Sequence, residues 1–487
     1  MSKKKLLVYG LCILLILALL SSCRDNNEFI DAESSAEQTS DNDESDSEID
    51  IIEESVNYED FVFTHIDGGY EISLYLGDSA ILKTPDEYEG EQVIKIGSSA
   101  FSECTSLERL VISGGVTYID YYAFANCTNL TSVQIPFGVK IIDDGAFYNC
   151  YALKSVEIPD GVTVIGGLVF ENCSSLASIE IPDSVINIGY GAFDGCDELK
   201  YNEFDNAYYL GNDENRYAAL IKADKNIKSC EIHSGTAVIA KMAFMDCEGL
   251  ANVKLPDSLK SIDYGAFSNC ASLNGIELPD GLLYLGDMAF KDCVNMTEVV
   301  IPDGVTRIGD GTFLGCRGLT YVELPEGLTS LGYGAFSDCK SLTSVDIPDG
   351  VINIGSEAFS GCSGLTEIDI PDGVTDLNYE VFADCIGLIG VEIPDGVTEI
   401  ADSAFFNCYG LKSANIPESV ISIGNNAFLA CVELTNVTFA NPTGWNLSEH
   451  INSASGKEKI SSQDLSDPSV AAEYLRSKYA DFYWERE

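Results

Sequence analysis

A single motif recurs along most of this sequence: a phenylalanine stands three residues before a cysteine, and a leucine follows the cysteine by three residues. Fourteen copies occur, and Met296 replaces the leucine in one of them. Successive cysteines are 23 residues apart, except that 28 additional residues lie between Cys196 and Cys247. A fixed period of this length is typical of a solenoid, whose repeats are too short to bury a core alone and become stable when stacked. The motif therefore restricts this part of the chain to a stack of coils.

Residues 342–362 show how one coil is built. Val345 and Ile347 alternate with polar residues, which predicts a short, half-buried strand. Pro-Asp-Gly at 348–350 predicts a turn, because proline removes a backbone donor and glycine tolerates positive φ. The apolar residues at both ends of 351–354 have helical spacing, so we expect short helical turns there. The expected fold class is an α/β repeat solenoid with short parallel strands and short helical turns.

This repeat resembles the BspA-like leucine-rich repeats of bacterial surface proteins, whose consensus is close to L-x-x-I-x-I-P-x-x-V-x-x-I-G-x-x-A-F-x-x-C. The resemblance covers residues 98–437, interrupted by an insertion at about 200–228. It implies a surface-exposed binding or adhesion protein. It carries over no catalytic residue, and it names no particular ligand.

Residues 1–22 have the features of a bacterial lipoprotein signal peptide. Three lysines precede an apolar run from Leu6 to Leu20, which is shorter than the roughly 20 residues of a membrane-spanning helix. The run ends in Leu-Ser-Ser-Cys, which resembles a lipobox. The resemblance implies that Cys23 becomes the mature N-terminus, carries diacylglycerol and anchors the protein to a membrane. An uncleaved anchor helix and a plain signal peptide are the alternatives, and all three predict export.

The segments between this leader and the first repeat differ in composition. Residues 23–57 are rich in Ser, Asp, Glu and Asn, which predicts a disordered acidic tether. An acidic ligand-binding tail is the alternative. Residues 58–97 lack the repeat motif and contain two alternating apolar runs around Asp-Gly-Gly, which predicts a β-hairpin that caps the first repeat.

Two further segments depart from the repeat. The insertion at about 200–228 has two strand-like runs around 212–215 and predicts a projecting hairpin, either a binding element or decoration. Residues 438–487 predict a C-terminal cap with a helix that starts at Asp467-Pro468 and runs to Tyr479. Trp445 and Trp484 either cover the core of the last repeat or form a sugar-stacking surface.

The cysteines are predicted to be buried free thiols. Apart from Cys12 and Cys23, fifteen remain, which is an odd number. Side chains that point the same way from adjacent coils would strain a disulfide, so a stack of small apolar residues fits the pattern better. Zinc is not expected, because the sequence has no Cys-x-x-Cys and only three histidines.

Acidic residues recur at two positions of the repeat, within a formal net charge of −51 that disfavours nucleic acid as a partner. At the outward strand position they form our candidate binding face, which consists of Glu323, Asp346, Asp369 and Glu392. At the turn position they are Asp257, Asp280, Asp303, Glu326, Asp349, Asp372, Asp395 and Glu418. Stacked carboxylates can attract Ca²⁺ or a basic partner. Turn chemistry alone also favours Asp before Gly.

The sequence points to binding and not to catalysis. It contains no H-E-x-x-H, no P-loop and no G-x-S-x-G, so no catalytic site is predicted, and no cofactor besides the lipid on Cys23. Our hypothesis is a lipid-anchored, extracytoplasmic protein at the cell surface that binds a surface or extracellular macromolecule, with a protein as the expected partner. The alternative is a structural spacer or coat protein without a specific ligand. Val300 and Tyr321 interrupt the acidic row and favour binding.

Overall fold

The computed structural model describes residues 57–449 and 458–486, which belong to one compact unit that extends from Val56 to Glu487. The predicted signal peptide, Cys23 and nearly all of the predicted tether lie outside the described residues. Within the described ranges, no helix has the length and apolar character that would let it cross a bilayer.

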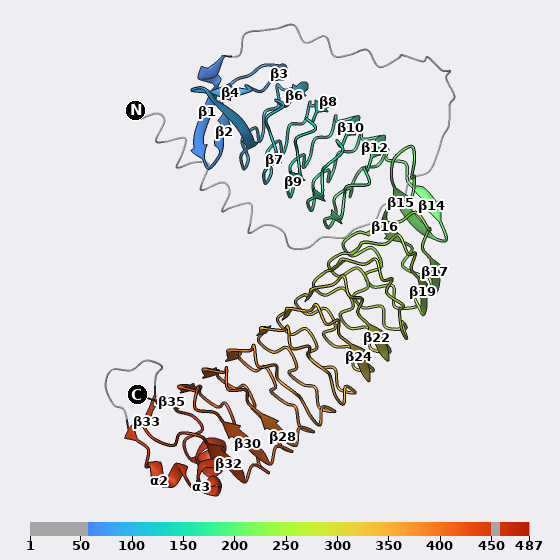
Figure 1. The fold of residues 1–487 in the computed structure, drawn as a ribbon. Coiled ribbons are helices and arrows are strands. Elements are labelled where there is room, and N and C mark those ends of the chain that lie inside the picture. Colours follow the sequence, from blue (N-terminus) through green and yellow to red (C-terminus); the bar gives the residue numbers. More distant parts are fainter. Residues whose placement is uncertain (1–56, 450–457, 487) are drawn as a thin grey trace, which may run out of the picture. The chain divides into compact units, whose positions relative to one another are not determined.

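Each repeat forms one coil, and the coils are stacked in sequence order from β6 to β32 (Figure 1). One strand of most coils belongs to a column that we call the front sheet, whose paired neighbours are parallel. Its strands are β3 (Ile81–Lys83), β6 (Arg109–Val111), β8 (Ser132–Gln134), β10 (Ser155–Glu157), β12 (Ser178–Glu180), β17 (Ser229–Glu231), β19 (Asn252–Lys254), β22 (Glu298–Val300), β24 (Tyr321–Glu323), β28 (Gly390–Glu392), β30 (Ser413–Ile416) and β32 (Asn436–Phe439).

A second column, the side sheet, follows the turn of each coil, and its paired neighbours are also parallel. Its strands are β5 (Glu91–Ile96), β7 (Tyr118–Ile119), β9 (Ile141–Ile142), β11 (Val164–Ile165), β13 (Asn187–Ile188), β16 (Ala219–Ala223), β18 (Val238–Ile239), β20 (Ser261–Ile262), β21 (Tyr284–Leu285), β23 (Arg307–Ile308), β25 (Ser330–Leu331), β26 (Asn353–Ile354), β27 (Asp376–Leu377), β29 (Glu399–Ile400) and β31 (Ser422–Ile423).

The expected helical turns are therefore wrong at 351–354, where the chain forms β26. Backbone angles explain why the Phe-x-x-Cys segment is not helical either. In every copy the residue two before phenylalanine and the residue before cysteine have positive φ, as Gly334 (55°) and Asp338 (58°) do around Phe336. An L-residue helix cannot pass through such positions. The segment instead folds as successive tight turns.

The core is built from the repeated phenylalanines and cysteines. Neighbouring rings stack with centroids 4.9–5.9 Å apart, in one ladder from Phe101 to Phe193 and a second from Phe244 to Phe428. In twelve copies the thiol donates a hydrogen bond to the carbonyl oxygen of the phenylalanine in the preceding coil, as Cys339 does to Phe313 at 3.3 Å.

The predicted burial of free thiols is confirmed. All fifteen cysteines in the described ranges are unpaired with one another, and fourteen are buried. Burial raises the pKa of the Cys127 thiol to about 12, so the group stays protonated and remains a hydrogen-bond donor. The repeated cysteine is therefore a small core residue with a structural hydrogen bond.

The insertion does not project from the stack, contrary to expectation. Its strands β14 (Asn202–Phe204), β15 (Ala207–Leu210) and β16 pair in antiparallel order, and β16 then pairs in parallel with β18 of the side sheet. Ala207, Tyr209 and Leu220 are fully buried. The alternating apolar residues of β15 fill space inside the stack, at the point where the buried residues divide into two apolar clusters.

At the N-terminal end a hairpin lies next to the first repeat. A short 3-10 helix (Tyr58–Asp60) leads into β1 (Phe61–Ile66), which pairs in antiparallel order with β2 (Gly69–Tyr75), and β4 (Glu87–Tyr88) pairs with β5. The strand β2 also pairs with β5, the first strand of the side sheet. The ring of Tyr75 lies 5.1 Å from that of Phe101 and extends the ladder of rings.

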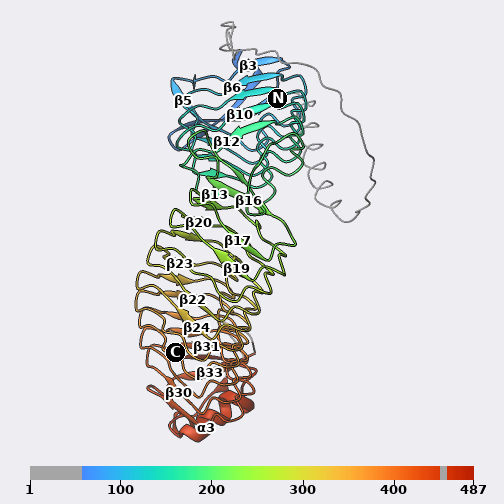
Figure 2. The same cartoon turned by 90° about the vertical axis from the view of Figure 1, so that its right-hand side faces the viewer.

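The C-terminal segment combines helices and strands instead of forming a helical cap. It contains β33 (Trp445–Ser448), β34 (Glu458–Lys459), α2 (Ser462–Leu465), α3 (Pro468–Glu473), a π-helical turn (Tyr474–Lys478) and β35 (Tyr483–Arg486). The Asp467 carboxylate accepts hydrogen bonds from the first turn of α3, as expected, but β35 covers the side sheet by pairing with β31. Figure 2 shows α3 at this end of the stack.

The two tryptophans belong to the core of this segment. Trp445 and Trp484 are each 1% exposed, and their indole N–H groups donate to backbone oxygens of Asn441 and Tyr479. Buried rings cannot stack on a sugar, so that alternative is wrong. They cover the last repeat together with Phe439.

The positive φ before each cysteine gives a testable prediction at Ala430, whose φ is 64° where nearly all other copies carry Gly, Asn or Asp. Ala430→Gly should raise the free energy of unfolding by roughly 0.5–1 kcal/mol, because relief of left-handed strain exceeds the entropic cost of glycine. Ala404→Gly, at a buried position without positive φ, should lower it by about 0.4–1 kcal/mol, because glycine has more conformational freedom in the unfolded chain. Urea denaturation of both variants checks this, and a loss of stability in Ala430→Gly would contradict it.

Candidate binding face

The outward side chains of the front sheet form a continuous row of exposed positions, which we call the front face. The predicted alternation is observed: Val345 and Ile347 are buried, and Asp346 between them is exposed. All four residues of the predicted row, Glu323, Asp346, Asp369 and Glu392, are exposed. Asp369 and Glu392 are direct partners in a parallel bridge. The structure therefore brings the predicted residues onto one face, where each lies on its own coil.

The row is chemically mixed at its N-terminal end. Val300 pairs with Glu323 in the parallel ladder and is 52% exposed. The hydroxyl of Tyr321, on the same strand as Glu323, donates a hydrogen bond of 2.9 Å to the Glu323 carboxylate. This bond holds a half-exposed aromatic ring beside the acidic row.

The predicted acidic turn residues are exposed as well, but the carboxylates do not converge. Within residues 57–449 and 458–486, no group of three or more His, Cys, Asp or Glu side chains has the arrangement of a metal site. Hard cations such as Ca²⁺ need six to eight oxygen ligands. The acidic columns thus present single charges, one per coil.

The front sheet is interrupted, which sequence reasoning missed. Where the front strands of two coils pair, the backbone N–H of the residue directly after one strand donates to the carbonyl oxygen of the last residue of the next strand. The Ile301 N–H donates in this way to the Glu323 carbonyl oxygen at 3.0 Å. The structure shows no equivalent bond, among its described residues, from Leu255 to Glu277 or from Leu278 to Val300. A second interruption separates β24 from residues 344–347.

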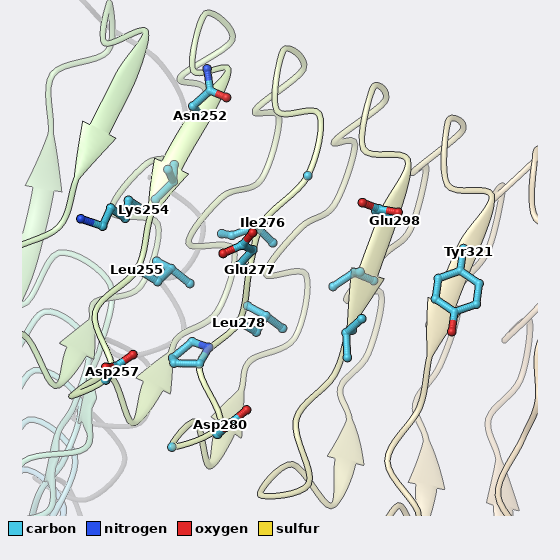
Figure 3. Close-up of a pocket in the computed structure, with 16 residues that line it drawn as sticks. Asn252, Lys254, Leu255, Asp257, Ile276, Glu277, Leu278, Asp280, Glu298 and Tyr321 are labelled. Atoms are coloured by element: carbon cyan, nitrogen blue, oxygen red, sulfur yellow. The ribbon is translucent and has the colours of Figure 1, made fainter.

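A groove lies at each of these two interruptions. The larger, of about 970 Å³, extends from β19 across residues 275–281 to β22 and Tyr321 (Figure 3). The smaller, of about 500 Å³, extends from Tyr321 to Asp349. Tyr321 lines both grooves, so the two adjoin at this residue, and we call them together the path. Glu298 points toward the coil of Ile276 and Glu277, whereas Lys254 extends away toward the preceding coil.

A third groove, of about 400 Å³, lies where the insertion meets the front face. Asn212 donates hydrogen bonds to the Ile181 carbonyl and the Asp183 carboxylate, which holds the insertion loop against the stack. Phe137 lines this groove and is 76% exposed at a turn position where other coils carry mostly acidic residues. Phe137 is not among the residues that the sequence analysis singles out. Aligning the repeats would have shown it as an aromatic residue at a mostly acidic position.

The carboxyl group with the strongest shift lies away from the front face. Asp263 is 3% exposed beside β20, its Oδ2 has no hydrogen-bond partner, and burial raises its pKa to about 6. The backbone N–H of Tyr264 donates to the other oxygen. Because Asp263 is enclosed and lines none of the three grooves, its shifted pKa affects stability and gives no sign of catalysis.

The raised pKa makes stability depend on pH. Asp263 is protonated in both states below about pH 4, and ionisation penalises the folded state progressively as pH rises through about 6. Asp263→Asn should therefore raise the free energy of unfolding at pH 7.5, by up to about 3 kcal/mol, with little effect at pH 4. Urea denaturation at both pH values measures this. Asp280→Asn, at an exposed turn, is the control that should show no such difference, and equal effects of both variants would exclude our assignment.

Coils of this period, with a leucine at the start of each front strand and a buried phenylalanine and cysteine before the next, define a leucine-rich repeat solenoid. The sequence matches the BspA type leucine rich repeat region, in six copies, over residues 90–213, 220–343 and 330–450. These ranges cover more than half of the chain, so the protein belongs to this family. The matched family is a repeat family and indicates no catalytic activity.

Solved structures include similar solenoids. A leucine-rich repeat protein from Bacteroides ovatus is 27% identical over 80% of this chain and 94% of its own, with a TM-score of 0.37. A leucine rich cell surface protein from Faecalibacterium prausnitzii is 26% identical over 79% of this chain and 94% of its own, with a TM-score of 0.31. Because both TM-scores lie below 0.5, the family assignment rests on the repeat match. Among curated proteins, none matches this chain.

Proposed function

We propose that this protein is a lipid-anchored, extracytoplasmic binding protein of the cell surface, and that its front face contacts a macromolecular partner, most simply a protein. The observation that carries the proposal is the front face itself, where exposed Val300 and Tyr321 interrupt the acidic row beside two grooves. A spacer without a ligand would need solubility, which uniform charge supplies, and would have no use for an exposed aromatic ring in a groove.

Family membership supports a binding role in general terms. Repeat solenoids present extended surfaces on which many weak contacts add up, and their stability comes mainly from the stacked repeats and the interfaces between them. Outward positions can therefore vary with the partner while the core stays constant. In this chain the outward positions of successive front strands include glutamate, valine, aspartate and lysine.

Membrane anchoring rests on the sequence alone and gives its own prediction. Cells that express the wild-type chain should incorporate labelled palmitate into it and retain it in the membrane fraction, because acyl chains on Cys23 hold it there. Cys23→Ala should abolish the label. Cys12→Ala, within the apolar run, is the matched control and should leave labelling unchanged. Equal labelling of wild type and Cys23→Ala would show that Cys23 is not the lipid attachment site.

The binding role is tested with two pairs of charge reversals. Asp369→Lys with Glu392→Lys alters adjacent coils of the front face, and Asp376→Lys with Glu399→Lys alters adjacent, equally exposed coils of the side sheet. Both pairs change the net charge equally. We expect the protein to bind members of an array of extracellular proteins, and the front pair to weaken this binding about tenfold or more, since rim charges contribute on the order of 1 kcal/mol each.

Two results would contradict the proposal. If the wild-type protein and its variants are folded but bind no protein in the array, the result would favour a structural spacer without a specific ligand. If the side-sheet pair weakens binding as much as the front-face pair, the contact surface is not the front face. Circular dichroism and thermal unfolding establish that both variants are folded.

A further inference from the structure

The path formed by the two front-face grooves has a strongly one-sided charge. Four carboxylates line the larger groove (Asp257, Glu277, Asp280, Glu298), and four line the smaller (Glu323, Glu326, Asp346, Asp349). Lys254 is the one cationic residue that lines either groove, and its ammonium group is 2.5 Å from the Glu231 carboxylate of the preceding coil. A ligand in the path therefore meets negative charge that the protein itself does not neutralise.

The interruption of the front sheet leaves backbone groups within the path. Among the described residues, Gly275 to Leu278 make no main-chain hydrogen bond to β19 or β22. Backbone groups that lose a strand partner keep their capacity to donate and accept. A ligand with its own donors and acceptors, such as a polypeptide with Lys or Arg side chains, can use them.

Apolar surface in the path complements the charge. Val300 and Tyr321 are about half exposed, and Leu255 and Leu278 are partly buried in the groove walls. Long aliphatic stems of lysine and arginine pack on such surface while their charged ends reach carboxylates. The Tyr321 ring adds a site for a cation on its face.

The length of the path sets the size of the ligand. It crosses five coils, from Asp257 to Asp349. Paired parallel strands are about 4.8 Å apart, and unpaired ones cannot lie closer, so the path is at least roughly 20 Å long and accommodates about six or more residues of extended polypeptide.

We propose that this path binds an extended, basic segment of a partner polypeptide, with lysine or arginine side chains on the carboxylates of successive coils and one of them over Tyr321. This inference deepens the proposed function and rests on it, because it identifies the partner of the front face by its chemistry. Neutral or acidic polypeptides would leave the eight carboxylates unpaired and should bind much more weakly.

The test uses the folded mature protein and a fluorescein-labelled twelve-residue peptide in which Lys alternates with Thr, followed by fluorescence anisotropy. A Glu-Thr peptide, spermine and Ca²⁺ serve as comparison ligands. We expect saturable 1:1 binding of the Lys-Thr peptide, no binding of the Glu-Thr peptide, and affinity that falls as salt rises. Displacement of the peptide by equimolar spermine or by millimolar Ca²⁺ would mean that the path takes small cations and would overturn the proposal.

Variants locate the peptide on the path. Glu298→Lys with Glu323→Lys should weaken peptide binding at least tenfold, and the side-sheet control, Asp376→Lys with Glu399→Lys, less than twofold. Tyr321→Ser should weaken it roughly threefold to tenfold, whereas Tyr321→Phe should stay close to wild type, because the ring provides the contact. Equal losses in the two charge-reversal pairs would show attraction to net charge alone and would refute the proposed path.

The outcome separates this inference from the proposed function. If proteins of the array bind through the front face but the Lys-Thr peptide does not bind, the basic-segment proposal fails and the binding function stands. If the peptide binds on the path, both are supported. If neither the array nor the peptide binds to folded protein, both fail together.

Discussion

The whole stack depends on the register in which each coil places its phenylalanine ring on that of the preceding coil. Ring centroids stay 4.9–5.9 Å apart along each ladder, and in twelve copies the thiol donates to the phenylalanine carbonyl of the coil before it. Two residues with positive φ in each repeat bend the chain so that these contacts recur every 23 residues. A repeat without neighbours would lose the apolar contacts on both sides, so stability is shared along the stack.

The same register places every outward residue in a column, and this organises the surface. A row such as Glu323, Asp346, Asp369 and Glu392 results from one position of the repeat, since strict stacking brings that position onto one face. Exposed carboxylates at such spacing repel one another by only about 1 kcal/mol per pair in water. The core can absorb this cost, so the fold tolerates a row of like charges on its front face. Departures from the register, at the sheet interruptions and at the insertion, supply the grooves.

The sequence predicts correctly the features that follow from the spacing of residues within one repeat. It predicts wrongly the features that depend on packing against other segments. The alternation around Asp346 and the burial of the repeated cysteines followed from pattern alone. The spacing of the apolar residues at both ends of 351–354 predicts helical turns, and this prediction is wrong. Apolar residues three apart can also both point into the core from a non-helical coil. The composition of the insertion predicts a projecting hairpin, yet Tyr209 and Leu220 fill the interior, since two strands with apolar alternation can join the side sheet. The sequence allows two roles for Trp445 and Trp484, and their packing against Phe439 decides between them.

By itself, the sequence determined the repeat, its family, the outward acidic row and the absence of familiar catalytic motifs, because each of these follows from residue identity at a fixed spacing. Only the tertiary structure decided where the front sheet is interrupted, which residues line the grooves, and that Lys254 is directed toward Glu231 and not into the path. Hydrogen bonds between coils join residues 23 or more positions apart, and their formation depends on small differences in strand spacing. Near-identical repeats can therefore pair at one coil and separate at the next.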